Sequence, residues 1–299
     1  MADTALRETD ERADESMIGL GILYDKQFAI QRISQAAPVS QRNHHYHNAY
    51  ELYYLYSGER YYFIKDKTYH VKRGNFVLIK PYDIHCTSNF GKNGYDRCLI
   101  MFRSSFIQDL AEHMGGHNIF ECFDRDINLI KLNFQEQSFV ENLLLSMTNE
   151  YNAKAPGYED FLRTALYQLL LLASRHAEGD ESKESVTENT THKTVSEVAA
   201  YINNHFDEDI TLESISERFF ISPSYFSRTF KRVTGVSFVE YVNGVRIKEA
   251  QRLLAKTDMS ISELGEMIGY KSMTHFGRSF KAIVGMSPSE YRRIKKQPR

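Results

Sequence analysis

A repeat in the last third of the sequence constrains the fold more than any other feature. Residues 225–231 read Tyr-Phe-Ser-Arg-Thr-Phe-Lys, and residues 275–281, fifty positions later, read His-Phe-Gly-Arg-Ser-Phe-Lys. The similarity continues through a Gly-x-Ser triplet at 235 and 285 and a Glu-Tyr pair at 240 and 290. A repeat of this length with helical periodicity indicates one supersecondary unit that has been duplicated.

The first copy carries the signals of two helices joined by a tight turn. Apolar residues recur at helical spacing in the first of them, namely Leu212, Ile215 and Phe219. Ser222 followed by proline begins the second, because serine caps a helix and proline needs no N–H at the first helical position. Phe226 and Phe230 face the core, and Gly235 ends the helix. The first copy is therefore predicted to be a helix-turn-helix, preceded by an amphipathic helix over 194–206.

The second copy repeats this plan after a long connecting helix over 237–256. Ser260 and Ser272 are the predicted N-caps of its two helices. Gly265 indicates that these helices approach each other closely. Gly244, in the middle of the connecting helix, costs about 1 kcal/mol relative to alanine. A kink and close packing against a neighbour are both open as the reason for this glycine.

Each second helix has a polar outer face once the phenylalanine pair of its copy is assigned to the core. The predicted DNA contacts are Ser224, Ser227, Arg228, Lys231, Met273, Thr274, Gly277, Arg278 and Lys281. Arginine can bond O6 and N7 of guanine together, serine and threonine can bond base edges or phosphates, and lysine positions the phosphate backbone. Phosphate contact is the alternative for both arginines. The repeat thus predicts binding of double-stranded DNA through two recognition helices.

Residues 194–293 resemble the AraC/XylS family of bacterial transcriptional regulators. The resemblance rests on Ser-Pro-Ser-Tyr-Phe-Ser-Arg-x-Phe-Lys from 222, on Arg-Ile-x-x-Ala-x-x-Leu-Leu from 246, and on the ending Gly-Met-Ser-Pro-Ser-Glu-Tyr-Arg from 285. It implies that the recognition helices enter two successive major grooves on one DNA face, about 34 Å apart. It also implies RNA polymerase as a partner if the protein is an activator. Because the two outer faces differ, the site read by each subunit is expected to be non-palindromic.

A β-rich texture fills the chain from about residue 18 to residue 100. Short runs of Tyr, Phe, Val and Ile between turn residues predict strands at 50–56, 60–64, 68–72 and 75–79. Short strands at even spacing are typical of a small antiparallel barrel or sandwich. The predicted fold class is therefore α+β multidomain, with an N-terminal antiparallel β-barrel and helical hairpin before an all-α double helix-turn-helix domain.

A polar group of side chains lies within the predicted barrel. Its members, taken as ligand-binding residues, are His45, His47, Glu51, Tyr53 and His85. The first four are odd-numbered and therefore share one face of a strand. The spacing resembles the two-part signature of cupin barrels, in which histidines and a glutamate meet around a metal. Asp83 departs from that signature, which usually has glycine at this position.

Three interpretations of this group remain open. The favoured one is a polar small-molecule pocket without metal, and the expected effector is a carbohydrate, because Tyr-rich polar pockets suit sugars and the family often binds them. In the second, His45, His47, Glu51 and His85 bind a divalent Zn, Mn, Fe or Ni ion. The protein is then a metal sensor, or a metal-dependent cupin enzyme with a DNA-binding domain attached. In the third, these residues only pack.

The predicted domain order has six parts. These are a flexible arm over 1–16, the ligand-sensing barrel over 17–125, a helical hairpin over 126–177, a linker over 178–193, the DNA-binding domain over 194–293 and a basic tail over 294–299. The hairpin is inferred from apolar residues at helical spacing, namely Ile127, Ile130, Phe134, Phe139, Leu143 and Met147, and from a second such run over 161–172. A homodimer interface is favoured for it, and packing on its own barrel is the alternative.

Charge and composition agree with this organisation. The net charge is -2, yet residues 193–299 hold 17 Lys and Arg against 12 Asp and Glu, which favours a nucleic-acid-binding half. The three cysteines lack paired spacing, so reduced buried thiols are expected. The sequence shows neither a signal peptide nor a membrane-spanning run. A cytoplasmic regulator without enzymatic activity is therefore expected.

Overall fold

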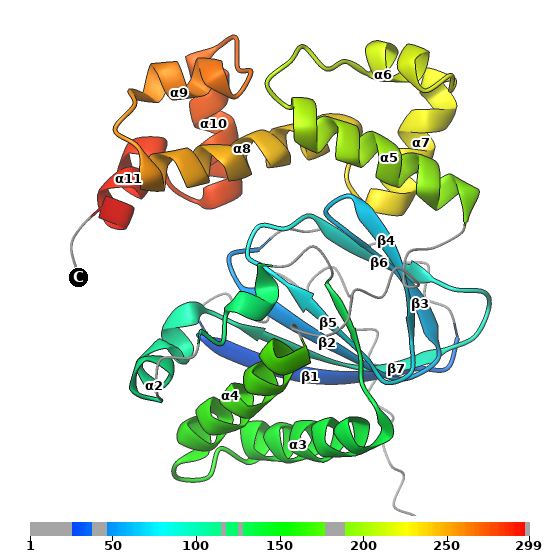
Figure 1. Cartoon of the computed structure of the whole chain (residues 1–299), viewed down its shortest axis with the longest axis vertical. Helices are drawn as coiled ribbons and strands as arrows, with labels where there is room; N and C mark the ends of the chain where they lie inside the picture. Colours follow the sequence, from blue (N-terminus) through cyan, green and yellow to red (C-terminus); the bar gives the residue numbers. More distant parts are fainter. Residues whose placement is uncertain (1–25, 38–46, 115–117, 125–127, 177–188, 297–299) are drawn as a thin grey trace, which may run out of the picture.

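The computed structural model describes residues 26–37, 47–114, 118–124, 128–176 and 189–296. Within these ranges the N-terminal half is built on two antiparallel sheets and the C-terminal half is helical, as Figure 1 shows. Every helix in these ranges is too short or too polar to serve as a transmembrane span. The predicted arm over 1–16 lies outside the described residues, as does most of the predicted linker.

The two sheets contain all four strands that the sequence predicted, each within one residue of its expected bounds. The larger sheet has the order β1-β7-β2-β5-β8, and the smaller has the order β4-β3-β6. The strands are β1 (Phe28–Gln35), β2 (Tyr50–Ser57), β3 (Glu59–Ile64), β4 (Lys67–Lys72), β5 (Asn75–Ile79), β6 (His85–Asn89), β7 (Tyr95–Phe102) and β8 (Leu129–Lys131). The sheets face each other as in a cupin, but among the described residues they do not join into a closed barrel.

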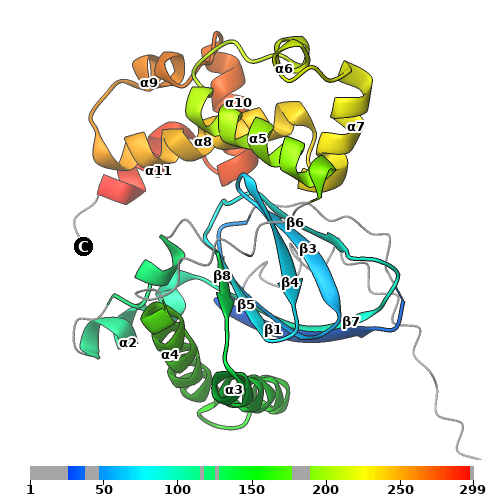
Figure 2. The same ribbon diagram turned by 45° about the vertical axis from the view of Figure 1, so that its right-hand side comes forward.

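Both faces of the larger sheet are buried, because side chains alternate across each strand. In β2, Tyr53 and Leu55 belong to the inner cluster between the sheets. Leu52 and Tyr54 belong to an outer cluster with the helices α3 (Phe134–Ala153) and α4 (Tyr158–His176). Figure 2 shows these two helices on the face of the larger sheet that is turned away from the smaller one. Between β7 and β8 the chain forms η1 (Ser104–Phe106), α2 (Gln108–His113) and η2 (Glu121–Phe123).

The beginning of the helical hairpin differs from the prediction. Ile130 lies in β8, which pairs with β5, and α3 begins only at Phe134 after a capping box closed by Asn133. A strand of three residues has no period that distinguishes it from a helix, so only its pairing with β5 identifies it. Phe134 and Phe139, two of the apolar residues at helical spacing from which the hairpin was inferred, are 84% and 43% exposed. The buried residues of α3 are instead Val140, Leu144 and Met147, and Ile127 lies outside the described residues.

The helical half consists of two small units. Its helices are α5 (Thr190–His205), α6 (Leu212–Arg218), α7 (Pro223–Thr234), α8 (Phe238–Lys256), α9 (Ile261–Met267), α10 (Met273–Val284) and α11 (Pro288–Lys296). α5 begins four residues before the predicted helix, because the side chain of Asn189 caps it. α11 includes residues 294–296, which were predicted to be a tail. The three cysteines are free and buried, as expected.

The long helix α8 joins the cores of the two units. Its first half contributes Phe238 and Tyr241 to the cluster of α5, α6 and α7. Its second half contributes Ile247 and Leu254 to the cluster of α9 and α10. Figure 1 shows α8 running from one unit to the other above the sheets. The spacing of the two units therefore depends on one continuous helix.

Candidate DNA-reading helices and barrel site

Local sequence signals determine where both recognition helices begin and end. α7 starts after Ser222 with proline in the first turn, and it ends at Gly235, which has a φ of 82°. α10 starts after Ser272, whose hydroxyl accepts a hydrogen bond from the backbone N–H of His275, and it ends at Gly285 with a φ of 85°. Glycine favours this left-handed conformation, so the two helices end at the same step of the repeat.

The outer faces of α7 and α10 are open to solvent. The exposed members of the predicted DNA-contact set are Ser224, Arg228, Lys231, Thr274, Arg278 and Lys281, and the half-buried members are Ser227, Met273 and Gly277. Arg278 donates from Nε to the carbonyl oxygen of Thr274 at 3.4 Å, within its own helix. The polar face of each recognition helix is thus accessible to an extended ligand such as a DNA duplex.

Met273 does not project fully outward as predicted. It packs against the core of the second unit, and its sulfur would lie 2.6 Å from a Cβ added at Gly265. Met273 therefore fills the space between α9 and α10 that a glycine at 265 leaves open. The prediction that Gly265 permits close helix approach is confirmed.

The turn of the first unit exposes two aromatic side chains that the sequence analysis did not single out. Phe220 is 95% exposed and has a φ of 53°, whereas the second unit has Gly269, with a φ of 85°, at the equivalent step. Tyr225, in the first turn of α7, is 50% exposed. One sequence signal could have indicated the exposure of Phe220. It directly follows Phe219, the last residue of the apolar helical pattern, and so falls outside that pattern.

Arg246 connects the two units in addition to α8. It donates from Nε to the carbonyl oxygen of Phe206 at 2.7 Å and from a terminal nitrogen to that of Glu208 at 2.8 Å. Its guanidinium also lies 5.6 Å from the ring centre of Tyr270 in the second unit. Arg246 therefore has a structural role at the C-terminal end of α5. This contact restricts how far the two recognition helices can move apart.

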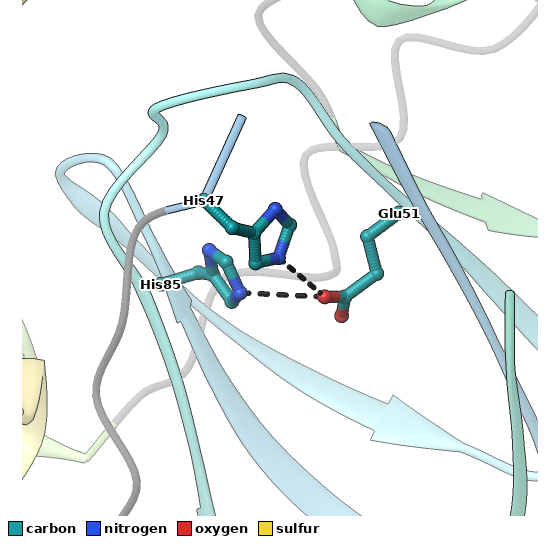
Figure 3. Close-up of side chains that lie close together, drawn as sticks. All are labelled: His47, Glu51 and His85. Atoms are coloured by element: carbon teal, nitrogen blue, oxygen red, sulfur yellow. Dashed lines mark hydrogen bonds and ion pairs between the residues drawn. The ribbon is translucent and has the colours of Figure 1, made fainter. Parts of the chain in front are cut away.

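Within the barrel, His47, Glu51 and His85 meet between the sheets (Figure 3). Nε2 of His47 lies 3.0 Å from Oε2 of Glu51, and Nε2 of His85 lies 3.4 Å from the same oxygen. Tyr62 donates its hydroxyl proton to the other carboxylate oxygen at 2.5 Å. All three potential ligand atoms lie within 4.8 Å of one another. His45 lies outside the described residues, so the structure places two of the three predicted histidines here.

Backbone contacts orient both imidazole rings. Nδ1 of His47 donates to the carbonyl oxygen of Ala49 at 3.1 Å, and Nδ1 of His85 donates to that of Asp83 at 2.8 Å. A carbonyl oxygen only accepts, so each Nδ1 carries a proton. Each Nε2 faces a carboxylate oxygen and needs either a second proton or a cation in that place. This arrangement fits a divalent metal ion, whose histidine ligands usually donate their other N–H to a carbonyl or carboxylate.

The charges of the cluster support one another. Burial alone would raise the pKa of Glu51, but His85 and His47 outweigh it and lower the pKa well below its usual range. Burial alone would lower the pKa of His85, yet Glu51 and the carbonyl of Asp83 raise it. Tyr53, the remaining predicted ligand residue, is 2% exposed, with its ring 5.2 Å from that of Tyr62. The site therefore combines a buried anion with groups that carry positive charge or hydrogen-bond donors.

A cupin-like sheet domain with a polar interior, joined to two helix-turn-helix units, defines a DNA-binding transcriptional regulator with a ligand-binding domain. The family model described as an AraC-like ligand binding domain matches residues 27–170, and the model described as a helix-turn-helix domain matches residues 215–294. The chain belongs to the AraC/XylS family of transcriptional regulators.

Several curated proteins are similar to this chain. It is 28% identical over 255 residues to the HTH-type transcriptional regulator YfiF of Bacillus subtilis, covering 84% of this chain and 79% of that protein. It is 34% identical over 121 residues to the regulator YtdP of Bacillus subtilis, which is 40% of this chain but spans 15% of that longer protein. It is 23% identical over 314 residues to the melibiose operon regulatory protein of Escherichia coli K12, covering 99% of this chain and 97% of that protein.

Proposed function

We propose that α7 and α10 read two unlike half-sites of an operator and that a small molecule in the barrel controls this binding. The observation that carries the proposal is the pair of exposed polar helix faces, held at one spacing by α8 and Arg246. Arg228 and Arg278 occupy equivalent positions on these faces and can each bond a guanine edge. Lys231 and Lys281 are exposed on the same faces and can contact phosphates.

Selection of DNA from a random pool, followed by hydroxyl-radical footprinting of the selected site, tests this reading. The expected footprint covers two successive major grooves on one face, about 10 base pairs apart. The two protected half-sites should differ in sequence, because the outer faces of the helices differ. Protection of one groove alone would contradict the proposed double reading.

A carbohydrate is the proposed effector of the barrel. The polar interior supplies the Tyr53 and Tyr62 rings together with His47, Glu51 and His85, which can stack on and hydrogen-bond to a sugar. The name of the melibiose operon regulatory protein, a relative across the full length of both chains, supports this class. Operator affinity measured with a panel of neutral mono- and disaccharides tests it. His47→Ala is expected to abolish the sugar response and to preserve operator binding.

A metal ion is the second candidate ligand, because both Nδ1 atoms donate to carbonyl oxygens while both Nε2 atoms face Glu51. His47, Glu51 and His85 would hold the ion, which would supply a Lewis acid or a sensed cation. Elemental analysis of the purified full chain, with operator binding measured before and after chelation, separates a metal sensor from a sugar sensor. A turnover screen of the metal-loaded protein tests the enzyme alternative.

The helical hairpin is the proposed homodimer interface. Phe139, Leu145 and Phe161 are exposed on α3 and α4, and a groove of about 390 Å³ between the helices includes Leu171 and Leu172 in its lining. Burying such side chains against a second copy would remove apolar surface from water. Phe139→Glu is expected to convert a dimer to a monomer in sedimentation velocity. If the protein is an activator, RNA polymerase is the further partner.

A further inference from the structure

The two halves of the chain are packed against each other. Tyr241 of α8 donates its hydroxyl proton to the carbonyl oxygen of Lys65 at 2.6 Å. Ile84 belongs to the apolar cluster of α5 and α7, and a Cβ added at Gly244 would lie 2.9 Å from its terminal methyl group. Gly244 therefore serves close packing between the domains, which is one of the two reasons that the sequence left open.

Asp83 joins the same surfaces through charge. Its carboxylate pairs with Lys248 of α8 and, at 3.5 Å, with Lys65 of the β3–β4 turn. Asp83 is only 1% exposed. The departure from the cupin signature at this position thus places a buried anion at the domain boundary. Two ammonium groups share one carboxylate, so this triad keeps an excess of one positive charge.

A cleft of about 870 Å³ opens beside this triad. One wall comes from the β3–β4 turn and the β5–β6 loop, and the other comes from α5, α8 and α11. Figure 2 shows α8 and α11 above the upper ends of the strands. The cleft therefore borders the barrel and both helix-turn-helix units at once.

The cleft is positively charged, although the whole chain has a net charge of -2. Its cationic lining residues are Lys65, Lys67, Lys80, Lys248, Arg252 and Lys295, and its carboxylates are Asp66 and Glu249. Arg252 pairs with Glu249 at 2.5 Å on the same helix. Counting also Asp83 and Asp124, which pair with Lys248 and Lys80, six cations face four carboxylates. A concave surface of one sign between low-dielectric walls concentrates ligands of the opposite charge.

Neutral donors converge at the end of the cleft near α11. Gln251 is 6% exposed, and its amide nitrogen has no partner of good hydrogen-bond geometry. It lies beside the hydroxyls of Tyr82 and Tyr291 in a loose contact. Burial raises the pKa of Tyr82 to about 12, and Gln251 offsets this only in part, so the hydroxyl keeps its proton. Gln251, Tyr82 and Tyr291 therefore lie together in the lining of the cleft.

We propose that this cleft binds a phosphate monoester of a sugar-sized polyol. A phosphate dianion matches the excess of positive charge, and its oxygens accept the several N–H and O–H donors. The rings of Tyr82 and Tyr291, with Val245 and Met286, provide apolar surface for the carbon skeleton. A monocarboxylate would neutralise less of the charge and would use fewer of the donors.

Such a ligand touches the barrel, the first unit and the second unit together. Because it binds only when these parts are docked, it stabilises the docked arrangement by mass action. The site is separate from the barrel cluster, and its occupancy depends neither on a sugar nor on a metal at His47, Glu51 and His85. It gives the regulator a second input that acts directly on the placement of the recognition helices.

Isothermal titration calorimetry of the full chain tests this site, with glucose 6-phosphate, glucose and inorganic phosphate as three separate probes. Glucose 6-phosphate is expected to bind at least tenfold more tightly than either of its parts. Lys248→Gln and Arg252→Gln should each weaken its binding about tenfold, since each removes a charged donor. Lys256→Gln, an exposed lysine at the end of the same helix, is the matched control and should leave binding unchanged.

Arg252→Gln keeps the proposal testable if Lys248→Gln disturbs docking, because the ion pair of Arg252 in the described part of the chain is with Glu249 of the same helix. Absence of glucose 6-phosphate binding at millimolar concentration would overturn the proposal, and so would equal binding by wild type and both variants. Inorganic phosphate that binds as tightly as the ester would overturn the polyol ester as its ligand. Operator binding of the ligand-free protein is measured alongside, so a failure of DNA reading is distinguished from a failure of this site.

Discussion

The two helix-turn-helix units have the same order of helices, but their hydrophobic cores differ in which parts of the chain contribute to them. The first unit packs Phe226 and Phe230 into a cluster that also contains Phe63 and Ile84 of the barrel. The second unit packs Phe276 and Phe280 into a cluster formed by residues of the helical half alone. A change in the barrel can therefore act on the first recognition helix directly. It reaches the second through α8, Arg246 and any ligand in the cleft.

The largest expected effect comes from removing a barrel side chain from the apolar cluster that the barrel shares with the first unit. This change should destabilise the first unit more than the second. Phe63 is 1% exposed and projects into the core of the first unit, so Phe63→Ala is expected to cost about 3–4 kcal/mol. Amide hydrogen exchange should accelerate in α5 and α7 far more than in α9 and α10. Phe134→Ala, at an 84% exposed site, is the control. Equal acceleration in both units would remove the distinction between them.

Substituting the equivalent arginines by alanine compares the base specificity of the two units. Arg228→Ala and Arg278→Ala are each expected to cost about 1–3 kcal/mol in operator affinity and to relax specificity at one base of their own half-site. Binding to a set of single-base operator variants measures this. An arginine whose loss weakens every sequence equally contacts phosphate instead of base.

Acidification should loosen the first unit selectively. His192 of α5 lies with its ring 4.5 Å from that of Tyr61 in the barrel, and burial together with Arg232 lowers its pKa to about 4. The unfolded chain takes up this proton near pH 6.5, so stability is fully present above pH 6.5 and is lost as pH falls toward 4. The loss should be of the order of 1 kcal/mol after solvent screening.

Urea unfolding of the wild type and of His192→Gln at several pH values between 7.5 and 5 measures this dependence. The variant should show a flatter pH profile over that range. The same slope in both proteins would exclude His192 as its source.

Relieving the turn of the first unit should have the smallest effect. Phe220→Gly replaces an exposed side chain at a φ of 53° and should stabilise the fold by about 0.5 kcal/mol. Gly269→Ala makes the reverse change in the second unit and should destabilise, because its Cβ would lie 2.8 Å from the carbonyl oxygen of Asp207. Urea unfolding midpoints measure both. A stability loss in Phe220→Gly would show that the exposed ring has a structural role in that turn.

Sequence patterns predicted the elements that carry strong local signals. Ser222 with its following proline, Ser260 as an N-cap and Gly235 as a helix end bounded their helices correctly, since caps and left-handed residues act within one turn. β8 was missed because three residues have no measurable period. The exposure of Phe139 on α3 was missed because a helical spacing does not reveal which of two faces a neighbour will cover.

The candidate sites also differ in how much of each the sequence predicted. The odd-numbered spacing placed Glu51 and Tyr53 on the inner face of β2, and the cupin resemblance brought His85 to them. The cleft had no sequence signal, because its lining residues come from loops, turns and helices that extend along the chain from Asn48 to Lys295. Asp83 was visible only as a departure from a motif. Its partner Lys248 could not be recognised before the fold placed α8 over the barrel.

The sequence by itself determined the two helix-turn-helix units. The repeat, the caps and the buried phenylalanine pairs are local features that specify the helices and their inward faces. Only the tertiary structure decided that the barrel docks on the first unit, that Gly244 serves this docking, and that a cationic cleft forms beside it. The physical reason is that docking depends on long-range burial and charge pairing, which no window of neighbouring residues contains.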